Sequence, residues 1–323
     1  MLSTPPEEWT QRLPDDKATR HPFRGRLLTF DELAALRASE RLDVQSTVEA
    51  RRERYRACRK AIAALADVFA AARIDVAVLI GNDQMECFRG DVMPAFGVMW
   101  GETIRNSMYD EARLASLPPG IAISIPGYIP PDGAEYPGVP DLGRHIIECA
   151  IREGFDVTSI RDMPYGETPH AFGFIYRQIM NDRPVPSVPV FVNTYYPPNQ
   201  PTVQRCAEFG SMLVRAIESW KSHARVAIIG SGGLTHFAID EEFDRRFLDA
   251  LRTNDLDSLT SLDEFDFQSG TSELKNWIPV ASAMAAVGLT GHLVAYVPCY
   301  RSAAGTGTGM GFMYWQESRE PLA

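Results

Sequence analysis

Two histidines and one glutamate stand where side chains could perform acid-base or metal chemistry. His236 ends the turn Gly230-Ser-Gly-Gly-Leu-Thr-His236, which follows an apolar run at 225–229. Glycines allow a sharp turn that presents a side chain at its apex, so His236 is a candidate general acid or base. His170 follows a proline turn, and Glu273 lies in the first turn of a predicted apolar helix. Acidic residues also favour helix N-termini for structural reasons, so Glu273 alone does not establish a site.

A second polar turn follows the apolar run at 74–80. It places four polar side chains directly after a predicted buried strand: Asn82, Asp83, Gln84 and Glu86. In open α/β sheets, ligands bind beyond the carboxyl ends of the strands, which makes this turn a candidate site. A helix cap or a solvated turn explains the same residues equally well.

The glycine-rich segments also suggest nucleotide binding. The dinucleotide fingerprint, however, requires a glycine where this sequence has Thr235. The segment 304–311 resembles a phosphate-binding loop but lacks the Lys-Ser/Thr ending and a following helix. Binding of NAD or ATP at 230–233 is kept as an alternative hypothesis.

Helices and strands that alternate along the chain must position these residues. Apolar side chains recur every three or four residues from Tyr55 to Phe69, which predicts an amphipathic helix over 46–73. Thr29 is placed to cap a short helix. Further helices are expected at 141–153, 201–221, 241–253 and 272–287, and strands at 74–81, 121–126, 188–195, 225–230 and 292–298.

This order predicts an α/β fold: a single domain with a mostly parallel central sheet flanked by helices on both faces. Residues 1–45 are rich in proline and charged residues and are expected to form an N-terminal arm on the domain formed by 46–323.

Charge and cysteine content limit the possible partners and location. The formal net charge of −10 leaves no basic excess to neutralise phosphates, so neither nucleic acid nor a membrane is an expected partner. The five cysteines form no C-x-x-C pair, which favours free thiols and a cytoplasmic location. The polar, acidic first residues predict neither a signal peptide nor an anchor.

Taken together, the motifs resemble a known family. Its marks are the glycine turn ending in His236, the Asn-Asp-Gln84 turn, the Pro-His170-Ala-Phe-Gly segment and the Ser-Glu273-Leu-Lys-Asn-Trp segment. This set is similar to the class III extradiol ring-cleavage dioxygenases of the protocatechuate 4,5-dioxygenase β-subunit type. The tracts at 2–9 and 300–312 resemble the branch that acts on gallate and O-methylgallate. The resemblance implies that 46–323 is an extradiol dioxygenase-like catalytic domain.

The resemblance also implies a cofactor and residue roles. The family holds Fe(II) with two histidines and one glutamate, which leaves coordination positions for a catecholic or gallate-like aromatic acid and for O₂. Carried onto this sequence, Glu273 is a metal ligand, His236 is the acid-base residue and His170 lines the substrate pocket. A homo-oligomer, such as a dimer, is expected. Separately, side-chain chemistry suggests Arg301 and Tyr176 as residues that could hold a substrate carboxylate.

This sequence departs from the family pattern at two metal ligands. One histidine ligand would precede the tract at 2–9, upstream of Met1, and the other would fall at Gln84. A glutamine oxygen binds ferrous iron less well than imidazole does, although Glu86 could contribute. One hypothesis is a chain shortened at its start, with the missing strand leaving an exposed sheet edge. The other is a metal-free relative, either a non-oxidative enzyme for a phenolic ring or a catalytically silent subunit.

Overall fold

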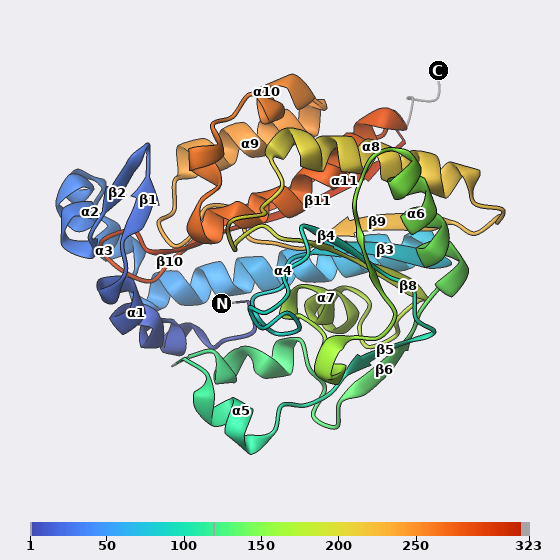
Figure 1. The fold of residues 1–323 in the computed structure, drawn as a ribbon. Helices are drawn as coiled ribbons and strands as arrows, with labels where there is room; N and C mark the ends of the chain where they lie inside the picture. Colours follow the sequence, from blue (N-terminus) through green and yellow to red (C-terminus); the bar gives the residue numbers. More distant parts are fainter. Residues whose placement is uncertain (1, 119, 318–323) are drawn as a thin grey trace.

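A computed structural model describes residues 2–118 and 120–317. At its centre lies a five-stranded sheet in the order β7-β4-β8-β3-β9 (Figure 1). Its strands are β3 (Val76–Gly81), β4 (Phe96–Met99), β7 (Thr158–Ile160), β8 (Ser187–Val192) and β9 (Val226–Gly230). Strand β3 is parallel to β8 and β9, and β4 is parallel to β7, whereas β4 and β8 are antiparallel. The predicted α/β class and mostly parallel sheet are therefore confirmed.

Strand β3 is buried along its whole length, and its side chains alternate between two apolar clusters. Ala77 and Leu79 belong to a cluster that includes residues of α4 (Val48–Ala72) and α7 (His170–Phe174). Val78 and Ile80 belong to a cluster with residues of the helices α6 (Pro140–Arg152), α8 (Val203–Ser219) and α11 (Trp277–Ala286). This packing fixes β3, so the turn after it is held at a defined place.

The remaining elements surround this centre. The other helices are α1 (Leu13–Ala18), α2 (Phe30–Leu36), α3 (Leu42–Gln45), α5 (Glu111–Ser116), α9 (Glu241–Thr253) and α10 (Leu256–Thr260). The other strands are β1 (His21–Phe23), β2 (Arg26–Leu28), β5 (Thr103–Asn106), β6 (Ala134–Pro137), β10 (Thr290–Tyr300) and β11 (Gly307–Gln316). Six segments form 3-10 helices, namely Pro6–Arg12, Ala38–Glu40, Ala122–Gly127, Pro164–Gly166, Glu264–Phe267 and Ser269–Asn276, and Ile175–Ile179 forms a π-helix. Within the described part of the chain, no helix combines the length and apolar character needed to cross a membrane.

The strand predicted at 121–126 is wrong, because Ala122–Gly127 forms a 3-10 helix. The backbone N–H of Ser124 donates to the carbonyl of Ile121, and that of Tyr128 donates to Ile125. Pro126 has no N–H to contribute to a strand ladder, so local bonds replace strand pairing there.

The C-terminal strands also differ from the prediction. Strand β10 covers 292–298 as expected, but it pairs antiparallel with β11 in a separate hairpin and does not join the central sheet. The segment 304–311, which resembles a phosphate loop in the sequence, supplies the first half of β11. A Cβ atom at Gly309 would lie 2.2 Å from Oδ2 of Asp244, so the glycine allows this strand to pack closely.

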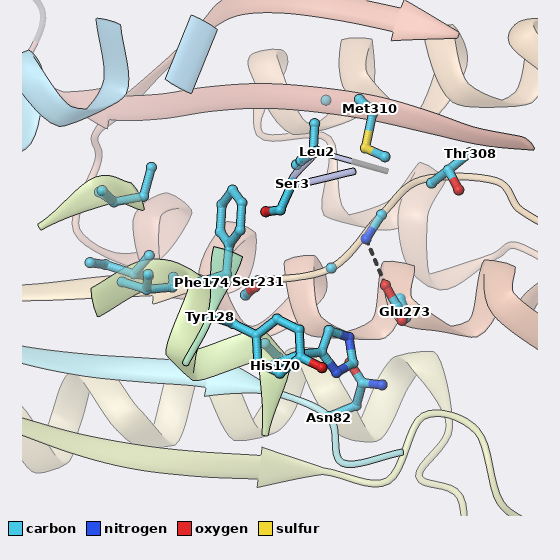
Figure 2. Close-up of a pocket in the computed structure, with 18 of the residues that line it drawn as sticks. Leu2, Ser3, Asn82, Tyr128, His170, Phe174, Ser231, Glu273, Thr308 and Met310 are labelled. Atoms are coloured by element: carbon cyan, nitrogen blue, oxygen red, sulfur yellow. Dashed lines mark hydrogen bonds between the residues drawn. The ribbon is translucent and has the colours of Figure 1, made fainter. Parts of the chain in front are cut away.

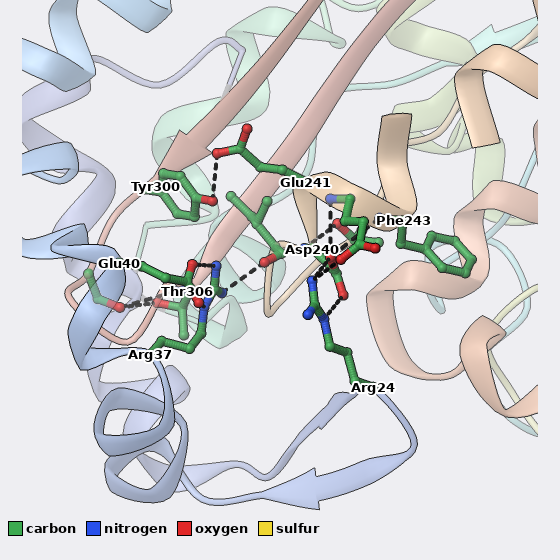
Figure 3. A network of polar contacts seen from close by, with 12 residues as sticks. Arg24, Arg37, Glu40, Asp240, Glu241, Phe243, Tyr300 and Thr306 are labelled. Carbon is green, nitrogen blue, oxygen red and sulfur yellow. Dashed lines mark hydrogen bonds and ion pairs between the residues drawn. The ribbon is translucent and has the colours of Figure 1, made fainter. Parts of the chain in front are cut away.

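Buried and half-buried ion pairs hold residues 2–45 against the rest of the molecule. Asp16 accepts two hydrogen bonds from Arg301, at 2.6 and 2.7 Å, and both side chains are buried. Arg24 donates to both carboxylate oxygens of Asp240 at the start of α9 (Figure 3). These contacts join segments more than 200 residues apart and fix the N-terminal residues that line the cavity described next.

Candidate active site

A cavity of about 820 Å³ lies at the carboxyl ends of β3 and β9. Residues after both strands line it, together with the 3-10 helix Ser269–Asn276, helix α7, strand β11 and residues 2–4 (Figure 2). Strand β9 is the edge of the central sheet, and its residues are only half-buried because they face this cavity. The glutamate and both histidines singled out in the sequence are among its lining residues.

Glu273 is buried and held by two hydrogen bonds from distant segments. Its Oε1 accepts from the Nε2 of Gln84 at 2.8 Å, and its Oε2 accepts from the backbone N–H of Gly233 at 2.7 Å. Burial acts to raise the pKa of Glu273, but the nearby His236 and His170 and the Gly233 amide lower it to about 2. The carboxylate is therefore ionised at neutral pH.

The glycine turn brings this carboxylate and His236 together. A Cβ atom at Gly232 would lie 2.9 Å from the backbone oxygen of Glu273, so the missing side chain permits the close approach. The backbone N–H of Gly233 donates its hydrogen bond to Glu273. The next helix, α9, begins only at Glu241. The turn therefore lacks the arrangement of a dinucleotide site, in which free amides open a helix.

The ring of His236 has a defined orientation. Its Nδ1 lies 2.7 Å from the carbonyl oxygen of Leu234, so Nδ1 carries a hydrogen and donates it. Its Nε2 lies 3.7 Å from Oε1 of Glu273. The ring also packs against Gly270, where a Cβ atom would lie 2.2 Å from the His236 Cδ2. The ring nitrogen on the side of Glu273 is thus the one that can exchange a proton with a ligand.

His170 forms a close pair with Glu86. One carboxylate oxygen of Glu86 accepts from both Nδ1 of His170, at 2.8 Å, and the backbone N–H of His170, at 2.9 Å. Burial acts to lower the pKa of His170, but the charge and hydrogen bond of Glu86 raise it to about 9. The pKa of Glu86 is correspondingly lowered despite its burial. At neutral pH the site therefore presents an imidazolium, with Tyr128 edge-on at 6.0 Å between ring centroids (Figure 2).

The other residues of the turn after β3 have structural partners. Asp83 accepts from the backbone N–H groups of Cys87 and Phe88, so it holds a turn as one hypothesis expected, but this turn is buried at Asp83 rather than solvated. Burial and the charge of Glu86 raise the pKa of Asp83 to about 6. The Oδ1 of Asn82 accepts from the Nδ2 of Asn276 at 2.8 Å.

The structure does not bring Tyr176 to the cavity, and it gives Arg301 a structural partner. The hydroxyl of Tyr176 lies 2.6 Å from the Oγ of Ser187 in the apolar core. Arg301 lines the cavity, but its guanidinium is engaged by Asp16. The guanidinium of Arg301, which was expected to hold a substrate carboxylate, is thus already paired with the carboxylate of Asp16.

The described residues do not fit the iron site that the resemblance implies. Within the described ranges, no three His, Cys, Asp or Glu side chains are grouped so that they could hold one metal ion. At the position of the second histidine ligand, Gln84 turns its amide nitrogen, a donor, toward Glu273. A metal ligand must instead direct a lone pair at the ion, so this arrangement is a hydrogen bond rather than a half-built metal site.

Sequence reasoning missed several residues of the cavity wall. Tyr109, Arg113 and Tyr128 line it, and Thr308 and Met310 of β11 lie across from Glu273 (Figure 2). Tyr109 and Arg113 lie in a segment without a recognisable motif. The glycine-rich composition around Thr308 concealed a strand.

Comparisons with known proteins show the family of this chain. A family described as "Catalytic LigB subunit of aromatic ring-opening dioxygenase" matches residues 45–310. The gallate dioxygenase of Pseudomonas putida is 32% identical over 187 residues, which are 54% of this chain and 52% of that protein. The chain thus spans about half the length of this curated relative. A solved structure of JW3007, an uncharacterized protein of Escherichia coli K12, has a TM-score of 0.45 and 11% identity, covering 78% of this chain and 91% of that chain. As the motifs predicted, this chain belongs to the family of catalytic LigB subunits of aromatic ring-opening dioxygenases.

Proposed function

We propose that this chain binds a catecholic or gallate-like aromatic acid in the cavity beside Glu273 and acts as an extradiol ring-cleavage dioxygenase. The observation that supports it most is the meeting of Glu273, His236 and His170, from three distant segments, at one cavity. A ring with adjacent hydroxyls needs groups that accept and donate protons, and these side chains supply both.

The two histidines have different roles in this proposal. The Nδ1 of His236 donates to a carbonyl, so the ring is oriented with Nε2 available to a substrate hydroxyl. His170 has a pKa of about 9 and is therefore charged at neutral pH. It would stabilise the phenolate that forms when the hydroxyl loses its proton. Because the described residues do not fit an Fe(II) site, no step through iron is derived.

A second candidate function is that of a metal-free relative: a non-oxidative enzyme for a phenolic ring, or a catalytically silent subunit. The Gln84–Glu273 hydrogen bond favours it, because this bond occupies one carboxylate oxygen with an amide donor. The cytoplasmic location, the homo-oligomeric state and the division at residues 45 and 46 also remain predictions.

One experiment separates the two candidates. The chain is purified without oxygen and supplied with Fe(II), and bound iron and oxygen uptake are measured with gallate, O-methylgallate and protocatechuate. Near-stoichiometric iron with oxygen uptake would support the dioxygenase. Binding of an aromatic acid without iron or uptake would support the metal-free relative. Absence of iron, uptake and ligand binding together would contradict the dioxygenase and the non-oxidative enzyme, and would support the catalytically silent subunit.

A further inference from the structure

One cation on the cavity wall differs from its neighbours because it has no acidic partner among the residues that the structure describes. Three of the described arginines line the cavity: Arg12, Arg113 and Arg301. Arg301 is paired with Asp16, and Arg12 lies 3.3 Å from a carboxylate oxygen of Asp15. For Arg113, no Asp or Glu within the described residues lies at ion-pair distance.

The guanidinium of Arg113 is also short of hydrogen-bond acceptors. Its Nη2 donates to the backbone oxygen of Met85 at 3.2 Å, while its Nε is buried without an acceptor. The guanidinium packs 5.6 Å from the ring centre of Tyr109. A half-buried cation with unused donors on a cavity wall is stabilised by an anion, and a carboxylate matches its planar fork of N–H groups.

Its position relative to His170 suits a particular ligand. Tyr128 stands edge-on to His170, Tyr109 packs in the same apolar cluster as Tyr128, and Arg113 packs on Tyr109. Two tyrosines thus separate the imidazolium from the guanidinium along the cavity wall. In protocatechuate and gallate, the hydroxyls and the carboxylate lie at opposite ends of one ring. A ring whose hydroxyls face the histidines would therefore point its carboxylate away from them.

We propose that Arg113 binds the carboxylate of the aromatic acid and so determines that the site prefers acids to uncharged phenols. This inference rests on the proposed function, because it assumes that the cavity binds such a ring. The helix that carries Arg113 is held independently of the side chain, since Asp110 caps α5 by accepting from the Arg113 backbone N–H at 2.7 Å. Substitution of the side chain therefore leaves the cap in place.

The test compares two ligands that differ only in the carboxylate. Affinities for protocatechuate and for catechol are measured by isothermal titration calorimetry on the metal-free chain, in the wild type and in Arg113→Gln, Arg113→Lys and Arg12→Gln. We expect the wild type to prefer protocatechuate. Arg113→Gln should weaken protocatechuate binding by roughly tenfold or more and leave catechol binding unchanged. Arg113→Lys should retain part of the preference, because it keeps the charge but loses the fork.

Three outcomes would contradict the proposed role of Arg113, and one of them would also contradict the proposed function. If Arg113→Gln keeps the preference for the acid, or if Arg12→Gln abolishes it instead, Arg113 is not the carboxylate-binding residue, although the proposed function stands. If Arg113→Gln weakens both ligands equally, the side chain shapes the cavity rather than recognising the acid, and the proposal is wrong. If the wild type binds neither ligand, with Fe(II) absent and then in anaerobic excess, the proposed function fails together with the inference. Arg105→Gln is the matched control, because Arg105 is an exposed arginine in a surface pair with Glu135 and lies outside the cavity lining.

Discussion

The amide nitrogen of Gln84 lies 2.8 Å from Oε1 of Glu273, across 189 residues of sequence. An ionised carboxylate accepts hydrogen bonds only, so the amide must face it with its nitrogen. This hydrogen bond joins the turn after β3 to the 3-10 helix Ser269–Asn276, at the position where the family pattern would place a metal ion between two ligands. The residue at position 84 therefore decides whether the carboxylate of Glu273 accepts a hydrogen bond or is free to bind a metal ion.

Replacing the glutamine by histidine is expected to change that use. Gln84→His removes the amide donor and supplies an imidazole nitrogen that can act as a ligand beside Glu273. We expect Co(II) or anaerobic Fe(II) to bind this variant roughly tenfold more tightly than the wild type, which corresponds to about 1.4 kcal/mol. Calorimetric titration measures the difference. Gln84→Ala, which removes the donor without adding a ligand, should not gain affinity; an equal gain in both variants would contradict the explanation.

The His170–Glu86 pair should make stability depend on pH. The pKa of His170 is raised from 6.5 to about 9, so its contribution to stability is complete below about pH 6.5 and is lost as the pH rises through 9. The pKa of Glu86 is lowered, so its contribution is lost only in acid. The difference in unfolding free energy between wild type and Glu86→Gln should therefore be largest near about pH 6 and small near about pH 10. Urea titrations at both pH values measure it, with Glu135→Gln as an exposed control. If the difference in unfolding free energy instead grows with pH, the pair does not stabilise the protein through a charged His170.

Gly270 should be needed for the position of His236. A methyl group at residue 270 would lie 2.2 Å from Cδ2 and 2.6 Å from Nε2 of the imidazole, closer than van der Waals contact allows. Gly270→Ala is thus expected to displace the ring and lower affinity for protocatechuate by roughly tenfold or more. Gly154→Ala is the control, because nothing lies within 4 Å of its Cβ position. Its positive φ predicts a stability loss of about 1 kcal/mol with unchanged binding. If Gly270→Ala binds protocatechuate as tightly as the wild type does, the position of His236 does not matter for binding.

Arg301 should behave as a structural residue. Its guanidinium and the carboxylate of Asp16 are 4% and 2% exposed, so removing one partner leaves a buried charge without compensation. Asp16→Ala is expected to lower the free energy of unfolding by about 3–5 kcal/mol in urea titrations. Asp43→Ala breaks an exposed pair with Arg41 and should cost about 0–1 kcal/mol. A loss below about 1 kcal/mol for Asp16→Ala would mean that the pair does not hold the N-terminal residues in place.

Local signals predicted most of the helices and the buried strands. Thr29 caps α2 as expected, and the apolar stripe beginning at Tyr55 lies in α4, within one or two residues of the predicted bounds. Strands β3 and β8 stood out because buried strands are continuous apolar runs bounded by polar turns, and the half-buried β9 has the same kind of sequence. These features depend on neighbours in sequence, so the sequence contains them.

The rest depended on contacts between distant segments. The hairpin of β10 and β11 was missed because glycines lower strand propensity, whereas tertiary packing against Asp244 requires them. Arg301 and Asp16 are 285 residues apart, and no local sequence pattern predicts that they pair. The glycine turn, His236, His170 and Glu273 could be chosen from their motifs, but the donor from Gln84 to Glu273 could be found only from the structure.

The most direct test of the proposed function is a calorimetric titration of gallate into the anaerobic chain, with Fe(II) absent and then in excess. The arrangement of Glu273, His236 and His170 around the cavity predicts one molecule of gallate bound per chain, with an affinity that Gly270→Ala weakens. Absence of gallate binding under both conditions would contradict the claim that this cavity holds a gallate-like aromatic acid.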